Sequence, residues 1–93
     1  MGQDQDRTPI SAADADAGTR AREILHAIVS VYSALAGRAR SAGDIAEAER
    51  LTAERRPYTV ELRRLDVREQ DDVRRIIDTY PSRLAELERE LSA

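Results

Sequence analysis

The side chains that could carry acid–base or metal chemistry are few in this sequence. The chain has one histidine, His26, and no cysteine. A general base needs a partner that orients it, and a zinc or di-iron site needs several ligands at fixed spacing. No second histidine follows His26, and the four glycines stand apart instead of forming a phosphate-binding loop. We therefore predict no catalytic, metal-binding or cofactor-binding residue and expect no cofactor.

Arginine pairs are the residues best suited to hold a ligand. Arg55 with Arg56 and Arg63 with Arg64 lie in one expected helix, and guanidinium groups bind phosphate and carboxylate through paired N–H donors. These four are the candidates for an anion-binding site. The competing interpretation is a solvent-exposed face on which arginines pair with acids three or four positions away. That spacing occurs between Glu47 and Arg50, Arg50 and Glu54, Asp71 and Arg75, and Glu86 and Arg89, and it favours the second interpretation.

Three tyrosines, Tyr32, Tyr58 and Tyr80, are the only aromatic residues. Each falls on the apolar side of an expected helix. A tyrosine in that position usually fills the core and keeps its hydroxyl near the surface. We expect a role in packing, with a pocket lining as the alternative.

Composition limits the class of protein. The 93 residues include 15 alanines but only 19 leucines, isoleucines and valines, which argues against a β-rich domain. No apolar run is long enough to span a membrane, so we expect no membrane association. The net charge of −3 comes entirely from residues 1–19, because residues 20–93 carry 14 acids and 14 arginines. A neutral body makes nucleic-acid binding an unfavoured alternative. The arginine and alanine bias suggests a bacterial genome, and we expect a cytoplasmic location.

The spacing of apolar residues predicts an all-α fold, either an antiparallel helical hairpin or a three-helix bundle. Residues 1–19 lack any apolar period and are predicted to be a disordered acidic tail. The domain then covers residues 20–93, with helices over about 20–42, 45–65 and 67–92. In the first helix the apolar positions follow a heptad pattern, as in coiled coils: Ala21, Leu25, Ile28, Tyr32, Leu35, Ala39 and Ala42.

Turn and capping residues set the expected helix boundaries. Gly43 is placed to take a left-handed conformation after the first helix, and Asp44 with Glu47 resembles a capping box at the start of the second. We expect Ile45, Ala48 and Leu51 to form the apolar face of this second helix.

Two prolines leave the path of the chain open. Pro57 either ends the second helix or bends it, and we favour one helix with a bend; Pro81 should bend the third helix. The second and third helices are either separate or nearly continuous. The continuous arrangement is an alternative because no glycine lies between them.

The last helix carries a leucine strip that is a candidate partner-binding surface. It consists of Tyr80, Leu84, Leu87 and Leu91, set among glutamates and arginines. Large apolar residues are few for a chain that must order three helices, and small domains often make up this shortage by associating. We therefore predict that the strip pairs with a second copy or with another protein.

Residues 31–51 resemble one tetratricopeptide repeat. The matching positions are Tyr32, Leu35 and Ala36, then Gly43-Asp44-Ile45 at the turn and Ala48 after it. The resemblance implies a helical hairpin with small residues at the crossing, and peptide or protein binding. It ends after Leu51, where Thr52 and Arg55 replace the apolar and small residues of the pattern.

These observations favour a small non-enzymatic helical module for protein–protein interaction or assembly. Two alternatives remain. One is a small helical enzyme or anion-binding subunit that uses the arginine pairs, similar in size to the helical chorismate mutases. The other is a nucleic-acid-associated regulator.

Overall fold

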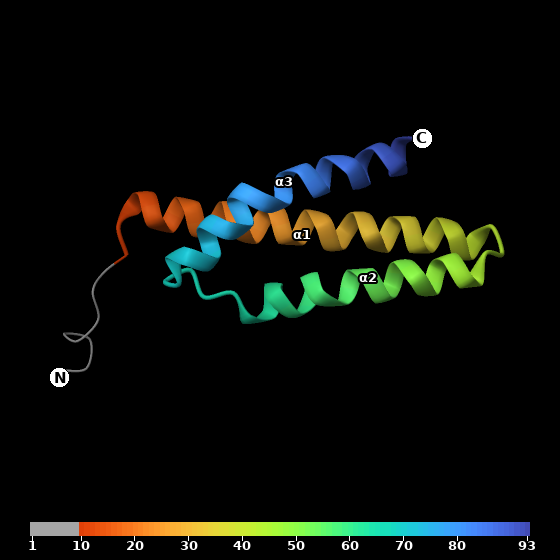
Figure 1. Ribbon diagram of the computed structural model, residues 1–93, viewed down its shortest axis with the longest axis horizontal. Coiled ribbons are helices and arrows are strands. Elements are labelled where there is room, and N and C mark those ends of the chain that lie inside the picture. Colours follow the sequence, from red (N-terminus) through yellow and green to blue (C-terminus); the bar gives the residue numbers. More distant parts are fainter. Residues whose placement is uncertain (1–9) are drawn as a thin grey trace.

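The computed structural model describes residues 10–93, which form three helices and no strand in that range. The helices are α1 (Ala12–Ser41), α2 (Ile45–Arg64) and α3 (Gln70–Ser92). α1 and α2 form an antiparallel hairpin, and α3 crosses α1 at an angle, from the side of α2 at its start to the opposite side at its end (Figure 1). The Cα trace measures 58 × 24 × 15 Å. The all-α prediction is confirmed, and the arrangement combines a hairpin with a third crossing helix.

α1 begins at Ala12, eight positions before the predicted start. Ser11 caps it, because its hydroxyl accepts the Asp14 N–H at 3.1 Å. The acidic side chain of Asp14 in the first turn also favours the positive end of the helix dipole. The predicted tail is therefore wrong for residues 12–19, where alanine propensity and a cap form a helix without an apolar period. Residues 10 and 11 of the predicted tail precede the helix, and residues 1–9 lie outside the described residues.

The turn between α1 and α2 follows the expected capping chemistry. Gly43 has a φ of 79°, and its N–H donates to Arg40 O while the Asp44 N–H donates to Ala39 O. These two bonds form a Schellman motif, which satisfies carbonyls that a helix end would leave without partners. The Asp44 carboxylate accepts the Glu47 N–H at 3.1 Å. The Glu47 side chain pairs with Arg50, so only half of the predicted capping box forms.

α2 and α3 are separate helices, joined by residues 65–69. Asp66 accepts the Arg68 N–H in this link, and no side chain caps α3 at Glu69. α3 starts at Gln70, three positions after the predicted start. Val67 of the link packs against buried Gly18 of α1. The nearly continuous arrangement considered above is therefore wrong.

Both prolines lie inside helices. α2 continues through Pro57 and α3 through Pro81. Each proline lacks the N–H that would bond to the carbonyl four residues earlier, yet packing on α1 holds the helix on both sides. α3 changes direction near its middle, in the region of Pro81 (Figure 1). The bend at Pro57 stays a prediction.

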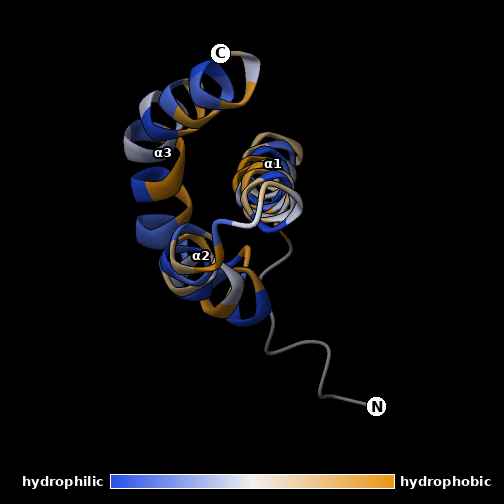
Figure 2. Cartoon of the chain, turned by 90° about the vertical axis from the view of Figure 1, so that its right-hand side faces the viewer, coloured by the Kyte–Doolittle hydropathy of each residue, from blue (hydrophilic) through white to orange (hydrophobic). Residues whose placement is uncertain are grey.

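α1 is the central helix of the fold, because α2 and α3 each pack along it. Within residues 10–93, no Cα atom of α2 lies within 8 Å of one in α3. Viewed from the end, the apolar sides of α2 and α3 turn toward α1 (Figure 2). The buried core follows the heptad pattern of α1 and includes Ala21, Leu25, Ile28, Tyr32, Leu35, Leu51, Val73, Ile76 and Leu87.

The hairpin is much longer than the tetratricopeptide repeat that residues 31–51 resemble. That repeat is a helix–turn–helix unit of about 34 residues, whereas α1 alone has 30. The long hairpin is completed by α3 of the same chain and does not rely on stacked copies of itself.

Candidate functional site

A cluster of tyrosines connects the three helices. The Tyr58 ring of α2 lies between two others, with its centroid 5.8 Å from Tyr32 of α1 and 5.2 Å from Tyr80 of α3. Tyr32 is buried, while Tyr58 and Tyr80 are partly buried against the core. The prediction that the tyrosines fill the core is confirmed.

The Tyr32 hydroxyl joins an acid of α2 to an arginine of α3. It donates to Glu54 Oε1 at 3.2 Å and accepts from Arg83 Nη2 at 2.8 Å. Arg83 also lies 3.6 Å from the Glu54 carboxylate, and its guanidinium is 5.9 Å from the Tyr32 ring centroid. Each of these side chains comes from a different helix, so the group links α2 to α3 across α1.

The Tyr80 hydroxyl repeats this arrangement near the link. It donates to the Glu61 carboxylate and accepts from Arg75 Nη1 at 3.0 Å, and Arg75 also pairs with Glu61. Side chains of α2 and α3 thus meet although their backbones do not. Neither group was predicted, because the spacing along the sequence pairs arginines with acids of their own helix.

The tyrosines and arginines of the two groups keep one protonation state at neutral pH. Burial raises the pKa of Tyr32 and of Tyr80, so both tyrosines stay neutral. Hydrogen bonding to Glu61 raises the pKa of Arg75, and hydrogen bonding to Tyr32 raises that of Arg83. Neutral tyrosines and charged arginines keep these hydrogen bonds intact, so each group acts as a structural clamp between helices.

The raised tyrosine pKa values predict a loss of stability in alkali. Unfolded tyrosine ionises near pH 10, and the folded pKa values of Tyr32 and Tyr80 lie higher. The contribution of these two tyrosines to the free energy of unfolding is complete below pH about 10. It is lost as the pH rises through their folded pKa. The sequence has no lysine or cysteine, so tyrosines dominate side-chain titration in this range. We expect the free energy of unfolding in urea to fall as the pH rises above about 10.

A double variant provides the control for this experiment. Tyr32→Phe with Tyr80→Phe removes both hydroxyls, so stability should depend less steeply on pH in the same range. An equally steep loss in the double variant would show that these two hydroxyls do not cause it.

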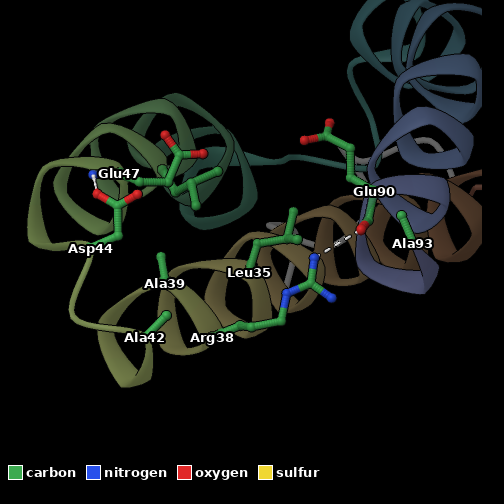
Figure 3. Close-up of a pocket in the computed structure, with 9 residues that line it drawn as sticks. Leu35, Arg38, Ala39, Ala42, Asp44, Glu47, Glu90 and Ala93 are labelled. Atoms are coloured by element: carbon green, nitrogen blue, oxygen red, sulfur yellow. Dashed lines mark hydrogen bonds between the residues drawn. The ribbon is translucent and has the colours of Figure 1, made fainter.

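A cleft lies near the turn between α1 and α2, where the end of α3 diverges from α2 (Figure 3). Its volume is about 380 Å³. Its lining comes from all three helices and includes Leu35, Ala39, Ala42, Asp44, Glu47, Glu90 and Ala93. Arg38 fastens the end of α3 beside the cleft, donating to Leu91 O at 2.8 Å and to Glu90 O at 2.9 Å. Asp44 and Glu47 are engaged in the cap and with Arg50, so this polar lining holds helix ends in place.

The leucine strip faces α1. Leu87 is 1% exposed and belongs to the core, whereas Tyr80, Leu84 and Leu91 are partly buried against it. The Leu87 side chain packs on α1 and is not accessible to a partner in this conformation, and its predicted role in partner binding stays a prediction. Partner binding by the other three stays a prediction without an exposed face to support it.

The structure brings together three of the four predicted anion-binding arginines. Arg55, Arg56 and Arg63 border a shallow hollow of about 220 Å³ on α2, together with Thr52, Thr59 and Val60. Arg64 lies beside a different hollow, near Arg75. Arg55 donates to Ser33 of α1 at 2.8 Å.

The side of α2 away from α1 carries a second stripe, which we call the outward face. It consists of Ile45, Glu49, Ala53, Arg56 and Val60, spaced four, four, three and four residues apart. Ile45 is 53% exposed, while Ala48 and Leu51 are buried as predicted. The assignment of Ile45 to the inner face is therefore wrong. At about 100° per residue it lies roughly 120° around the helix from Leu51.

His26 is exposed on α1. Glu23 precedes it by three residues, a spacing that di-iron proteins use, but Glu23 is exposed as well. No group of three potential metal ligands forms within residues 10–93, and no helix in that range is long and apolar enough to cross a membrane.

Comparisons with known proteins give no relative: no protein family, curated protein or solved structure matches this chain.

Proposed function

We propose that this protein is a non-enzymatic helical interaction module of the bacterial cytoplasm, which binds another protein chain through the outward face of α2. The observation that carries the proposal is Ile45. Among the described residues it is the one large hydrophobic side chain classed as exposed, at 53%. A partner that buries the exposed half of this side chain would contribute about 1 kcal/mol.

The surroundings of Ile45 support a protein partner. Ala53 is small and exposed at the middle of the outward face, so a second helix could approach closely there. Glu49 and Arg56 are exposed, and neither forms an ion pair within residues 10–93. An apolar residue, a small residue and two unengaged charges on one face are the elements of a polar-rimmed interface.

Site-specific crosslinking in cells tests this proposal. A photoreactive amino acid at position 45 should give one discrete protein adduct, identified by mass spectrometry. The same amino acid at position 34, where exposed Ala34 lies on α1, provides the control. The adduct should disappear in the Arg56→Glu variant. Equal labelling from both positions, or no adduct at position 45, would contradict the proposal.

Anion binding on α2 is the second candidate, favoured by the hollow that Arg55, Arg56 and Arg63 border. Three guanidinium groups around a shallow site fit phosphate or a dicarboxylate. Inorganic phosphate at millimolar concentration should then raise the melting temperature, and Arg63→Ala should abolish the increase, because a ligand bound only to the folded state stabilises it.

A further inference from the structure

The charges along α2 divide into two opposite halves. Residues 44–54 carry four acids and one arginine, a net charge of −3. Residues 55–64 carry four arginines and one acid, a net charge of +3. An isolated helix with this polarity complements an antiparallel copy of itself, because each half then meets the half of opposite sign.

We propose that the outward face of α2 pairs with the same face of a second copy of this chain, antiparallel and about a twofold axis. This inference rests on the proposed function and names its partner. Pairing about a twofold axis uses one surface on both copies, so that surface must complement itself.

The register follows from the residues of the outward face. With the twofold axis at the midpoint between Thr52 and Ala53, Ile45 of one copy lies level with Val60 of the other. Glu49 then lies level with Arg56, since each pair is equally distant from that midpoint. Symmetry doubles both contacts, which gives two apolar pairs and two ion pairs across one interface.

Local structure is compatible with this pairing. Val60 borders the hollow of about 220 Å³, which two threonines and three arginines also line, so the Ile45 side chain of the second copy would meet a concave surface at Val60. Ala53 at the crossing permits the short distance between axes that packed helices need. α1 and α3 both lie to one side of α2, which leaves its outward side uncovered (Figure 2).

Single charge reversals test the register. In a dimer of the Glu49→Arg variant, an arginine at position 49 faces Arg56 of the other copy at both ion-pair positions. In a dimer of the Arg56→Glu variant, a glutamate at position 56 faces Glu49 of the other copy at both positions. We expect each variant to raise the dimer dissociation constant at least about tenfold in sedimentation equilibrium at low salt. Glu23→Arg makes the same charge change on α1 and should leave the constant unchanged.

Recombination of the reversals is the decisive measurement. Mixing Glu49→Arg with Arg56→Glu places opposite charges at both ion-pair positions of the heterodimer, so the mixture should associate about as tightly as the unmodified chain. The double variant Glu49→Arg with Arg56→Glu should also recover self-association. Circular dichroism must show that all variants fold alike, since both side chains are exposed.

Several results would overturn the pairing. A monomer at protein concentrations up to about 1 mM would do so, because even weak small interfaces associate in that range. Failure of the mixture to associate would reject the register. Crosslinks from position 45 to a different protein alone would reject the second copy as partner but leave the proposed function standing. If Glu49→Arg tightens phosphate binding without affecting association, the face is an anion site.

Discussion

Leu87→Ala should lower the free energy of unfolding by about 2–5 kcal/mol, the usual loss when a buried leucine leaves a cavity. Leu87 is 1% exposed and lies in the core formed by α1 and α3. Urea unfolding followed by circular dichroism measures the change. The variant separates a core role from the partner-binding role that the leucine strip suggested, because loss of a surface contact would leave the stability of the monomer unchanged.

Leu84→Ala is the matched control for this prediction. Leu84 is one turn earlier on α3 and only partly buried, so the same truncation should cost clearly less than at Leu87. Equal losses at the two positions, or a larger loss at Leu84, would contradict the assignment of Leu87 to the core.

Gly18→Ala and Gly37→Ala should change stability in opposite directions. A Cβ at Gly18 would lie 2.6 Å from both Cβ and Cγ1 of Val67, whereas nothing lies within 4 Å of a Cβ at Gly37. Replacing glycine by alanine inside a helix raises the free energy of unfolding by up to about 1 kcal/mol. At Gly37 that gain should appear in full. At Gly18 overpacking of about 1–3 kcal/mol should outweigh it.

Thermal or urea unfolding of both glycine variants, compared with the unmodified chain, tests this contrast. Val67→Gly should reduce the penalty of Gly18→Ala, since it removes the atoms that collide. A Gly18→Ala protein more stable than its parent would mean that α1 and the link do not touch as described.

Much of the fold could be predicted because it depends on local rules. The heptad pattern of α1 identified the helix that carries most of the core, and Gly43 with Asp44 located the hairpin turn to within a residue. The early start of α1 was missed because the segment after Ser11 forms a helix through capping and alanine content. An argument from apolar periodicity cannot detect such a segment.

The candidate site could be predicted only in part, since it depends on contacts between helices. Two of the four expected local ion pairs form, Glu47 with Arg50 and Arg50 with Glu54. Arg75 instead reaches Glu61 of α2, and Glu86 pairs with Arg83.

The Arg83–Glu86 pair has the three-residue spacing of a pair within one helix, whereas Arg75 with Glu61 joins α3 to α2. The Arg75–Glu61 pair can be predicted only by knowing that α3 lies across from α2 with tyrosines between them. The exposure of Ile45 depends in the same way on which side of α2 meets α1.

The central position of α1 determines how the domain can open. α2 and α3 each rest on α1 and contact each other only through side chains. One flank can therefore detach by breaking those side-chain contacts while the other stays on α1. α1 cannot detach alone, because its release exposes the apolar side chains of both α2 and α3 at once. Amide protons in the middle of α1 should therefore exchange only through complete unfolding, and those of the two flanks through smaller local events.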